Sequence, residues 1–336
     1  MVTIKPKIHV IGTGGTISGT GSTATNAAYE SGSVDASELV GAIDGLDRLA
    51  DVHTETLFTT GSENLGPHQW RILARRIEQL TGTSDVDGLV VTHGTDTLEE
   101  AAFFLDLVCK PKKPVVLTAA MRPSTALSAD GPMNLFQAVL VATTPKLQNH
   151  EMLVVMNGLV IPAWQTIKTD SVALDSFCAY PGGPVGKIVG EDILIFGSPG
   201  VSSLSGRFHN HLRNDDKLPF VDIILLNGGY GEQPLDDWGK IKRKGLVIAG
   251  FGAGTMPENL AGLVSKLANS GCMIVVSSRV VRVTVLTETM TSIKSENVFP
   301  SGLLNPQKSA LLLSLALDAN LDALELAELF NVFVTQ

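Results

Sequence analysis

Hydrophobic and polar residues alternate along the chain in two recurring patterns. Short apolar runs of about five to seven residues, rich in Val and Ile, are typical of buried strands. Longer stretches with apolar residues every three to four positions lie between them and predict helices with one buried face. Before residue 196, the patterns predict strands at 8–12, 52–58, 88–92, 114–118 and 153–156, and helices at 36–43, 67–80, 97–108 and 132–142.

The alternation stops at residues 197–219, which are rich in Gly, Ser, Pro and charged residues and predict a linker. It then resumes with strands at 221–226, 245–249 and 273–276 and helices around 236–244 and 258–268. Two helices end the chain, the first with Asn305 as its cap and Pro306 in its first turn. These patterns predict an α/β protein with a mostly parallel sheet flanked by helices in a larger N-terminal domain (1–196) and a smaller α/β C-terminal domain (220–336).

Composition agrees with two soluble domains, since 336 residues of which 44% are hydrophobic and 18% charged can bury a sizeable core. The net charge of −9 argues against nucleic acid as a partner, because binding to phosphates needs a clustered basic surface. No apolar run approaches the roughly 20 residues of a membrane span. The first ten residues also lack a secretory signal, so we expect a cytoplasmic protein.

Cysteine and histidine spacing gives no sign of a metal or cofactor site. The three cysteines, Cys109, Cys178 and Cys272, are widely separated, which favours reduced and mostly buried thiols over disulfides or a zinc ribbon. His209 and His211 stand two residues apart without a nearby third ligand, so we interpret them as solvated linker residues. Neither pattern predicts a metal site.

The first polar cluster follows the first predicted strand, in the sequence "IHVIGTGGTISGTGS" at residues 8–22. Its glycines suggest a dinucleotide-binding turn, but Ile17 stands where the third glycine of that motif belongs. Two interpretations of Thr16 remain open. Its hydroxyl either faces a pocket beside free backbone N–H groups, which suit a developing oxyanion, or it only caps a turn.

Three further polar clusters follow the next predicted strands. Ser62 and Glu63 suit a zwitterionic ligand, although a lone Ser there is more often a helix cap. Thr95 and Asp96 precede a predicted helix. The usual role of a single Asp at this position is to cap the helix, so Asp96 is either a helix cap or a site residue. The fourth cluster covers residues 121–132 and contains several Ser residues and an Asp. Because ligands of open α/β sheets bind at the carboxyl ends of the strands, four such clusters in succession favour a site.

A threonine nucleophile needs a neighbouring base at neutral pH. His93 is close to Thr95 in sequence, but adjacent side chains of a strand point to opposite faces, which favours a buried, hydrogen-bonded histidine. Lys168 is an alternative base if burial lowers its pKa. The sequence alone does not distinguish Lys168 from a surface lysine.

Two segments resemble the signatures of a known family. "TGGTISG" (13–19) and "VVTHGTDTLEE" (90–100) are similar to the two signature segments of the bacterial-type L-asparaginases, homotetrameric amidohydrolases that include the glutaminase-asparaginases. The similarity continues through residues 120–135, 277–280 and 301–308 and spans essentially the whole chain. It implies hydrolysis of L-asparagine to L-aspartate and ammonia, with some glutaminase activity and with no metal or cofactor, in a homotetramer built as a dimer of intimate dimers.

The resemblance also implies roles for residues of the N-terminal domain. Thr16 is implied as the nucleophile and Tyr29 as its activator, on a loop (18–33) that closes over the substrate. Lys168 is implied to draw the proton of Thr95 in the second part of the site.

The same resemblance implies three binding residues besides these. Asp96 is implied to bind the α-ammonium group of the substrate with help from Glu63, and Ser62 to bind its α-carboxylate.

A neighbouring subunit is implied to complete the site. One of its residues corresponds to Thr255, at the end of "GFGAGT" (250–255), where the family often has Asn or Ser. The other is a glutamate near "TETM" (287–290), where ungapped counting gives Met290 and a small shift gives Glu288. Two rival functions are a subunit of a tRNA-dependent amidotransferase, which needs an extra domain and a basic docking face, and a non-catalytic amino-acid-binding module or nucleotide-binding dehydrogenase.

Overall fold

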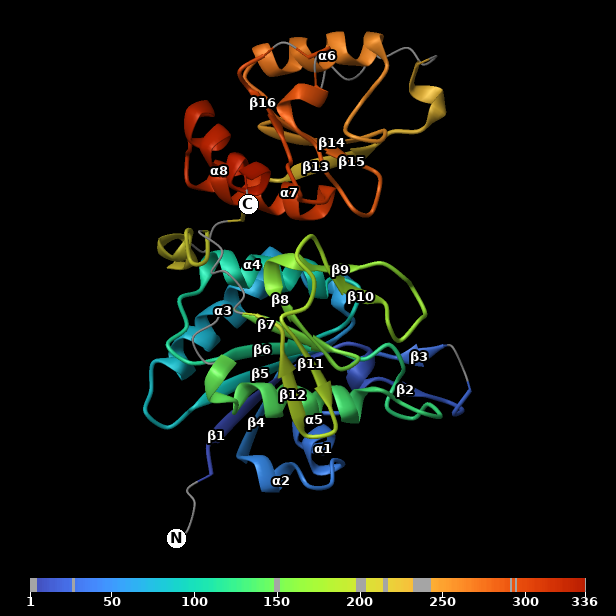
Figure 1. Cartoon of the computed structure of the whole chain (residues 1–336), viewed down its shortest axis with the longest axis vertical. Coiled ribbons are helices and arrows are strands. Elements are labelled where there is room, and N and C mark those ends of the chain that lie inside the picture. The colour runs from blue at the N-terminus through green and yellow to red at the C-terminus, as the bar shows by residue number, and fades with distance from the viewer. Residues whose placement is uncertain are drawn as a thin grey trace. The chain divides into compact units, whose positions relative to one another are not determined.

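The computed structural model describes residues 5–25, 28–147, 152–197, 204–213, 217–231, 243–290, 292–293 and 295–335. The chain forms two compact units, residues 1–215 and residues 216–336 (Figure 1). Each unit contains its own sheet, and each is described here by itself. The larger N-terminal unit and the smaller C-terminal unit confirm the predicted α/β fold class.

An eight-stranded sheet in the order β12-β11-β8-β7-β6-β5-β1-β4 forms the centre of the first unit. Five neighbouring strands are parallel: β4 (Asp51–Thr60), β1 (Lys7–Gly14), β5 (Gly88–Thr92), β6 (Val115–Thr118) and β7 (Leu153–Met156). All five lie where the apolar runs predict strands. Three more strands continue the sheet in antiparallel fashion: β8 (Leu159–Pro162), β11 (Gly186–Val189) and β12 (Asp192–Ile195).

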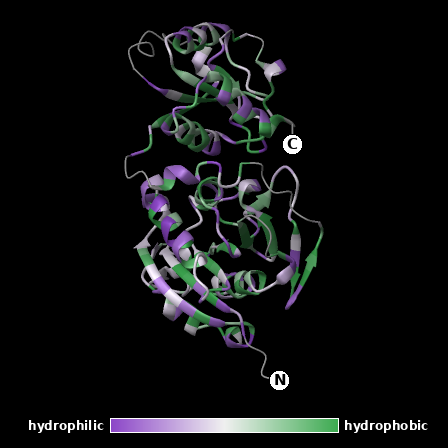
Figure 2. Cartoon of the chain, turned by 90° about the vertical axis from the view of Figure 1, so that its left-hand side faces the viewer, coloured by the Kyte–Doolittle hydropathy of each residue, from purple (hydrophilic) through white to green (hydrophobic). Residues whose placement is uncertain are grey.

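Helices cover both faces of this sheet, which is the arrangement that parallel strands require (Figure 1). One face carries α3 (Pro67–Thr81) and α4 (Leu98–Val108), which pack against each other. The other carries α1 (Ala36–Gly41), α2 (Leu46–Leu49) and α5 (Gly131–Ala142), whose apolar residues form one core with alternate residues of the strands. Figure 2 shows hydrophobic residues concentrated in the interior of each unit.

The antiparallel strands are the part of the sheet that the apolar runs miss. They are only four residues long and are joined by turns with backbone angles in the left-handed region, at Asn157 (φ 49) and Gly158 (φ 75) and at Gly190 (φ 64). Asn-Gly between two apolar pairs is a strong hairpin signal, so the sequence contains a marker for the β7–β8 turn. A separate small sheet joins β9 (Thr166–Lys168) to β10 (Phe177–Ala179), and another joins β2 (Thr20–Gly21) to β3 (Tyr29–Glu30).

The second unit is built on a parallel sheet in the order β13-β14-β15-β16. Its strands are β13 (Val221–Leu225), β14 (Gly245–Gly250), β15 (Met273–Ser278) and β16 (Val298–Pro300), and its helices are α6 (Glu258–Asn269), α7 (Pro306–Asp318) and α8 (Ala323–Thr335). The predicted cap is confirmed, because Asn305 Oδ1 accepts a hydrogen bond from the backbone N–H of Lys308 at 3.0 Å. The helix expected around 236–244 lies mostly outside the described residues.

Part of the predicted linker is folded onto the first unit. The backbone N–H groups of Gly206 and Phe208 donate to the carbonyl oxygens of Asp106 (2.7 Å) and Leu107 (2.9 Å) near the end of α4. The apolar side chains of this segment are buried: Leu204, Phe208 and Leu212. Residues 204–213 therefore form a docked strap, because three apolar residues within a polar stretch suffice to bury one side of it.

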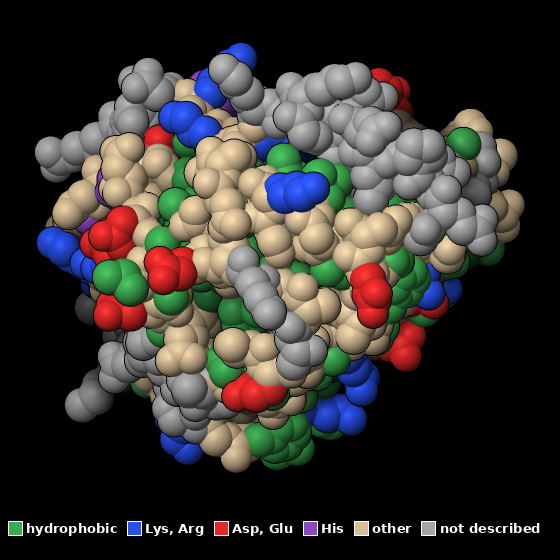
Figure 3. Space-filling view, turned by 90° about the horizontal axis from the view of Figure 1, so that it is seen from above, with side chains coloured by type: hydrophobic (Ala, Val, Ile, Leu, Met, Phe, Trp, Pro, Cys, Tyr) green, Lys and Arg blue, Asp and Glu red, His purple; other side chains and the backbone are tan. Residues whose placement is uncertain are grey.

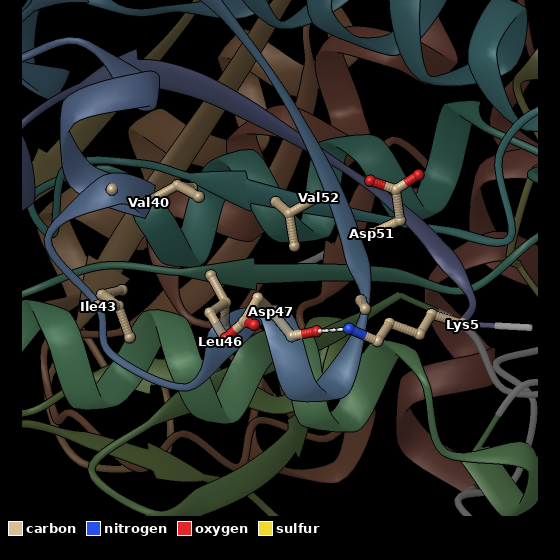
Figure 4. Close-up of a pocket in the computed structure, with 9 residues that line it drawn as sticks. Lys5, Val40, Ile43, Leu46, Asp47, Asp51 and Val52 are labelled. Carbon is tan, nitrogen blue, oxygen red and sulfur yellow. Dashed lines mark hydrogen bonds between the residues drawn. The ribbon is translucent and has the colours of Figure 1, made fainter. Parts of the chain in front are cut away.

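Surface features away from the sheet's carboxyl edge include a hollow of about 550 Å³ beside α1, α2 and the start of β4, lined by both apolar and charged residues. At its mouth, Lys5 Nζ donates to the backbone oxygen of Asp47 at 2.5 Å (Figure 4).

On the face drawn in Figure 3, acidic and basic side chains of the described residues are interspersed. Among the helices that the structure describes, none combines the length and the hydrophobicity that crossing a bilayer requires.

Candidate active site

The loops that follow β1, β4 and β5 meet at the carboxyl edge of the sheet. Gly14 and Gly15 have φ angles of 88° and 81°, and a Cβ atom on either would overlap the backbone of Thr60 or Gly94. The N–H of Gly15 also donates to the oxygen of Thr60 at 2.9 Å. These glycines therefore permit close contact between three loops, in place of the contact with a pyrophosphate that a dinucleotide site would require.

A small pocket of about 240 Å³ opens between these loops. Its lining residues come from the first three polar clusters and from the segment between β2 and α1: Gly15, Thr16, Tyr29, Ser31, Ser62, Glu63, Gly94 and Asp96. Five of the seven residues that the sequence indicates in this unit thus line one cavity. The other two, Thr95 and Lys168, are hydrogen bonded to each other, and Lys168 is also paired with Asp96.

Thr16 is the first residue of a short 3-10 helix (Thr16–Ser18), and its side chain is nearly fully buried. Its Oγ1 atom lies 2.7 Å from the phenolic oxygen of Tyr29, so the two hydroxyls share one hydrogen bond. Gly15 occupies the cap position of this helix, which excludes the interpretation of Thr16 as a cap. Tyr29 reaches Thr16 from the β2–β3 hairpin, at the right of Figure 1.

Ser62 connects the loop after β4 to the loop after β5. Its Oγ accepts a hydrogen bond from the backbone N–H of Asp96 at 3.2 Å, and its carbonyl oxygen accepts one from Thr97 Oγ1 at 2.9 Å. The hydroxyl hydrogen of Ser62 is then available to donate to a ligand. Helix α3 begins only at Pro67, with Gly66 at its cap, so the interpretation of Ser62 as a helix cap is wrong.

Asp96 does not cap the helix that follows it. Helix α4 begins at Leu98, and its cap residue Thr97 makes no side-chain capping bond. The Asp96 carboxylate instead accepts a hydrogen bond from Lys168 Nζ at 2.8 Å, while 63% of its side-chain surface stays exposed. Its remaining lone pairs are accessible from the pocket.

Lys168 ends the short strand β9, and its side chain reaches the loop after β5. Its Nζ atom lies 3.0 Å from Thr95 Oγ1 and 2.8 Å from Asp96 Oδ1, and only 17% of its side chain is exposed. Thr95 is buried beneath it. A lysine with these partners differs from the surface lysine that the sequence could not exclude.

His93 is the buried, hydrogen-bonded histidine that the strand alternation predicts. Its ring is fully buried, and Nδ1 lies 2.9 Å from the carbonyl oxygen of Gly94. Burial lowers its pKa to about 4, because the charged form loses its hydration. The ring is therefore neutral at physiological pH and contacts the backbone of the next residue.

The fourth polar cluster supports the first loop and does not line the pocket. Ser124 donates to the oxygen of Gly19 through both its N–H (2.9 Å) and its Oγ (2.8 Å). Thr125 Oγ1 accepts from the N–H of Gly21 at 2.8 Å, and the Asp130 carboxylate accepts from the N–H groups of Met121 and Arg122. The interpretation of this cluster as part of a ligand site is therefore corrected.

Glu63 and Ser31 complete the lining. The Glu63 carboxylate accepts from Asn64 Nδ2 at 3.1 Å and is otherwise exposed at the pocket. Sequence reasoning missed Ser31. It lies in the turn directly after β3 and belongs to no motif, so the sequence carried no signal for it.

The residues implied to serve a neighbouring subunit lie in the second unit. Thr255 pairs with Phe251 across the turn after β14, and Glu288 is exposed on a short 3-10 helix (Thr287–Thr289). Met290 is buried against a small core that includes Val283 and Val285. Of the two alternatives at this position, only Glu288 therefore presents a polar group at the surface.

Within the described ranges, no three His, Cys, Asp or Glu side chains come together as metal ligands. Cys109 and Cys272 are buried and Cys178 is partly buried, and all three are free thiols. The prediction of mostly buried thiols is confirmed.

Comparison with known proteins links these loops to one family. The family model described as "Asparaginase, N-terminal" matches residues 7–199, and the model described as "Glutaminase/Asparaginase C-terminal domain" matches residues 220–330. Together the two matches cover most of both compact units.

Full-length relatives agree with these matches. L-asparaginase 2 of Escherichia coli (strain K12) is 35% identical over 328 residues, covering 98% of this chain and 93% of that protein. The glutaminase-asparaginase of Acinetobacter glutaminasificans is 34% identical, covering 97% of this chain and 99% of its own. The crystal structure of a probable cytoplasmic L-asparaginase from Campylobacter jejuni superposes with a TM-score of 0.86 at 34% identity, covering 97% and 99% of the two chains.

Proposed function

The chain belongs to the asparaginase family, and we propose on this basis that it hydrolyses L-asparagine to L-aspartate and ammonia, with Thr16 as nucleophile. One observation carries the proposal. The Thr16–Tyr29 pair and Asp96, which is held by the Lys168–Thr95 pair, face a single pocket sized for a free amino acid. Glutamine is proposed as a poorer substrate.

The pocket's polar groups suit the two charges of a free amino acid. The carboxylates of Asp96 and Glu63 attract the α-ammonium group, and the hydroxyl of Ser62 donates to the α-carboxylate. Lys168 already pairs with Asp96 and so compensates the negative charge of one of these two carboxylates before a ligand binds. The side-chain amide then extends toward Thr16.

The reaction follows in two stages. Thr16 Oγ1 attacks the amide carbon while its proton passes toward the Tyr29 hydroxyl 2.7 Å away, and backbone N–H groups of the loops stabilise the oxyanion. The Tyr29 hydroxyl passes a proton on to the amide nitrogen, the C–N bond breaks, and the nitrogen leaves as ammonia. Water then attacks the resulting β-aspartyl ester, which releases aspartate and restores the Thr16 hydroxyl.

Thr95 and Lys168 form the second proton-transfer pair. In the structure the Lys168 ammonium donates to Thr95 Oγ1 and to Asp96 Oδ1. Once Lys168 has released a proton to the solvent, its neutral amine accepts the proton of Thr95, and Thr95 in turn accepts one from the attacking water. A proton is returned to Thr16 Oγ1 as the ester C–O bond breaks. Asp96 keeps Lys168 Nζ within hydrogen-bonding distance of Thr95 throughout.

The test is ammonia release from L-asparagine by the purified protein. We expect Thr16→Ala and Thr95→Ala each to lower kcat at least a hundredfold, because each removes a group that forms a bond or moves a proton. Thr54→Ala, in the middle of β4, is the matched control and should retain wild-type turnover. Full activity of either site variant would show that the role proposed for that residue is wrong.

We also propose a homotetramer in which Thr255 and Glu288 of a neighbouring subunit complete the pocket. Support comes from the family resemblance and from the surface position of Glu288, in contrast with the buried Met290. Light scattering should give four times the 35.5 kDa of one chain. A fully active monomer would contradict the proposal.

A cytoplasmic location is the remaining part of the proposal. It is supported by three free thiols, which suit a reducing compartment, and by similarity to a protein described as a probable cytoplasmic L-asparaginase. Cell fractionation with marker enzymes tests it.

A further inference from the structure

We propose that Glu99 is a positioning residue that holds Lys168 in place against Thr95. The inference rests on the proposed function, because it acts through the Thr95–Lys168 pair. Glu99 lies in the first turn of α4, where only 5% of its surface is exposed. Its Oε2 atom accepts a hydrogen bond from the backbone N–H of Lys168 at 2.6 Å.

The strand that carries Lys168 needs this acceptor. In the β9–β10 ladder Lys168 stands opposite Phe177, and the next residue, Thr169, donates its N–H to Ser176 at 2.7 Å. Because N–H groups of successive residues in an antiparallel ladder point in opposite directions, the N–H of Lys168 points away from β10. A partly buried N–H that faces away from its sheet requires another partner, and the Glu99 carboxylate supplies it.

Glu99 thereby joins the two elements on which the proton-transfer pair stands. Thr95 and Asp96 immediately precede α4, and Lys168 ends β9, so one hydrogen bond fixes the α4 side of the site relative to β9. The lysine side chain has four rotatable carbon–carbon bonds and does not by itself hold its ammonium group at 3.0 Å from Thr95 Oγ1. Anchoring its backbone reduces the range of positions that Nζ can take.

The acceptor and the charge of Glu99 are separable. Glutamine keeps an oxygen at the same position but removes the negative charge, whereas methionine has similar length and offers no good acceptor. If the hydrogen bond positions Lys168, Glu99→Gln should behave nearly as the wild type and Glu99→Met should not. Glu100 follows in the same helical turn and supplies a matched control, Glu100→Gln.

The first experiment measures kcat and KM for L-asparagine in these variants. We expect Glu99→Met to lower kcat about tenfold or more with KM changed less than about threefold, because substrate binding does not use the N–H of Lys168. Glu99→Gln should remain within about threefold of the wild-type kcat, and Glu100→Gln should be unchanged. A folded Glu99→Gln with a kcat as low as that of Glu99→Met would overturn the role of the acceptor.

A second experiment separates positioning from a general structural role. We expect the double variant Glu99→Met/Lys168→Met to have the same kcat as Lys168→Met alone. The midpoint of thermal unfolding should fall by a similar amount when Glu99→Met is introduced into the wild type and into Lys168→Met. If Glu99→Met lowers kcat by the same factor with and without Lys168, Glu99 does not act through Lys168 and the inference fails. Absence of ammonia release by the wild type would instead refute the proposed function, so the two failures are distinguishable.

Discussion

At the scale of single residues, the pocket depends on hydrogen-bonding atoms that the protein leaves available. Ser62 Oγ receives the N–H of Asp96, which leaves its hydrogen to donate. Asp96 receives Lys168 on one oxygen and remains exposed on its other side. Each polar residue is thus held by one protein partner and presents a second atom to the ligand, which fixes its orientation before binding.

This fixed arrangement predicts a preference between two substrates. We expect kcat/KM for L-asparagine to exceed that for L-glutamine at least tenfold. In the proposed binding mode the α-groups are anchored at Asp96, Glu63 and Ser62, so an extra methylene displaces the amide carbon from Thr16. Parallel assays of ammonia release over a concentration series of each amino acid measure the ratio. Equal values for the two substrates would contradict a rigid pocket.

At the scale of elements, the β2–β3 hairpin that carries Tyr29 is held at its base by the segment after β6. Ser124 bonds to Gly19, Thr125 Oγ1 accepts the N–H of Gly21, and the N–H of Leu127 donates to Ala24 at 3.0 Å. These bonds run along residues 19–24, which include β2, the strand opposite Tyr29. The position of Tyr29 relative to Thr16 therefore depends on a polar cluster outside the pocket.

We expect Thr125→Val, which removes the hydroxyl and keeps the shape, to weaken this support. Thr125 Oγ1 accepts from the N–H of Gly21 and also donates to its oxygen at 3.4 Å. Loss of this hydrogen bonding, about 1 kcal/mol per bond, should lower kcat/KM a few-fold and increase cleavage of the hairpin by a protease. Thr23→Val, at an exposed position of the same hairpin, is the control. Unchanged protease sensitivity in Thr125→Val would show that the hairpin does not depend on this bond.

At the scale of the whole molecule, the strap at residues 204–213 is docked on α4 next to a buried carboxyl group. Asp106 is fully buried, and its Oδ1 accepts a hydrogen bond from Ser205 Oγ at 3.0 Å. Burial raises the pKa of Asp106 to about 7, because the charged form is poorly solvated there, and the hydrogen bonds from Ser205 and Met152 only partly oppose this. The folded protein therefore retains this proton up to near neutrality, while the unfolded chain releases it near the ordinary pKa of an Asp.

This difference predicts how stability depends on pH. Between about pH 4 and pH 7 the folded state binds the proton more tightly, so stability decreases as pH rises through this range, and above it the loss is constant. Each pH unit between the two pKa values corresponds to about 1.4 kcal/mol. Asp106→Asn should remove this pH-dependent loss of stability. The free energy of unfolding of the variant should therefore increase relative to that of the wild type as pH rises. Urea unfolding at pH 5, 6, 7 and 8 compares the two, and parallel curves would contradict the prediction.

The amino-acid sequence by itself determined every parallel strand except the three-residue β16, and it indicated the loops that carry the candidate site residues. The strand at 88–92 is correct to the residue, because a segment buried on both faces must be continuously apolar. Thr16, Ser62 and Asp96 could be placed near one another, since they follow strands whose carboxyl ends share one edge. The sequence did not decide whether each of these side chains caps a helix or turn or binds a ligand, because both roles use the same residue types.

Only the tertiary structure decided the features that depend on contacts between distant segments. Lys168 stands in a three-residue strand far from Thr95 in sequence, and residues 204–213 dock through three scattered apolar side chains. Neither segment is long enough to show a periodic pattern, so its place is set by packing against α4. Local residue order fixes what a strand or helix must bury, whereas the pairing of Lys168 with Thr95 and Asp96 follows from how those elements pack together.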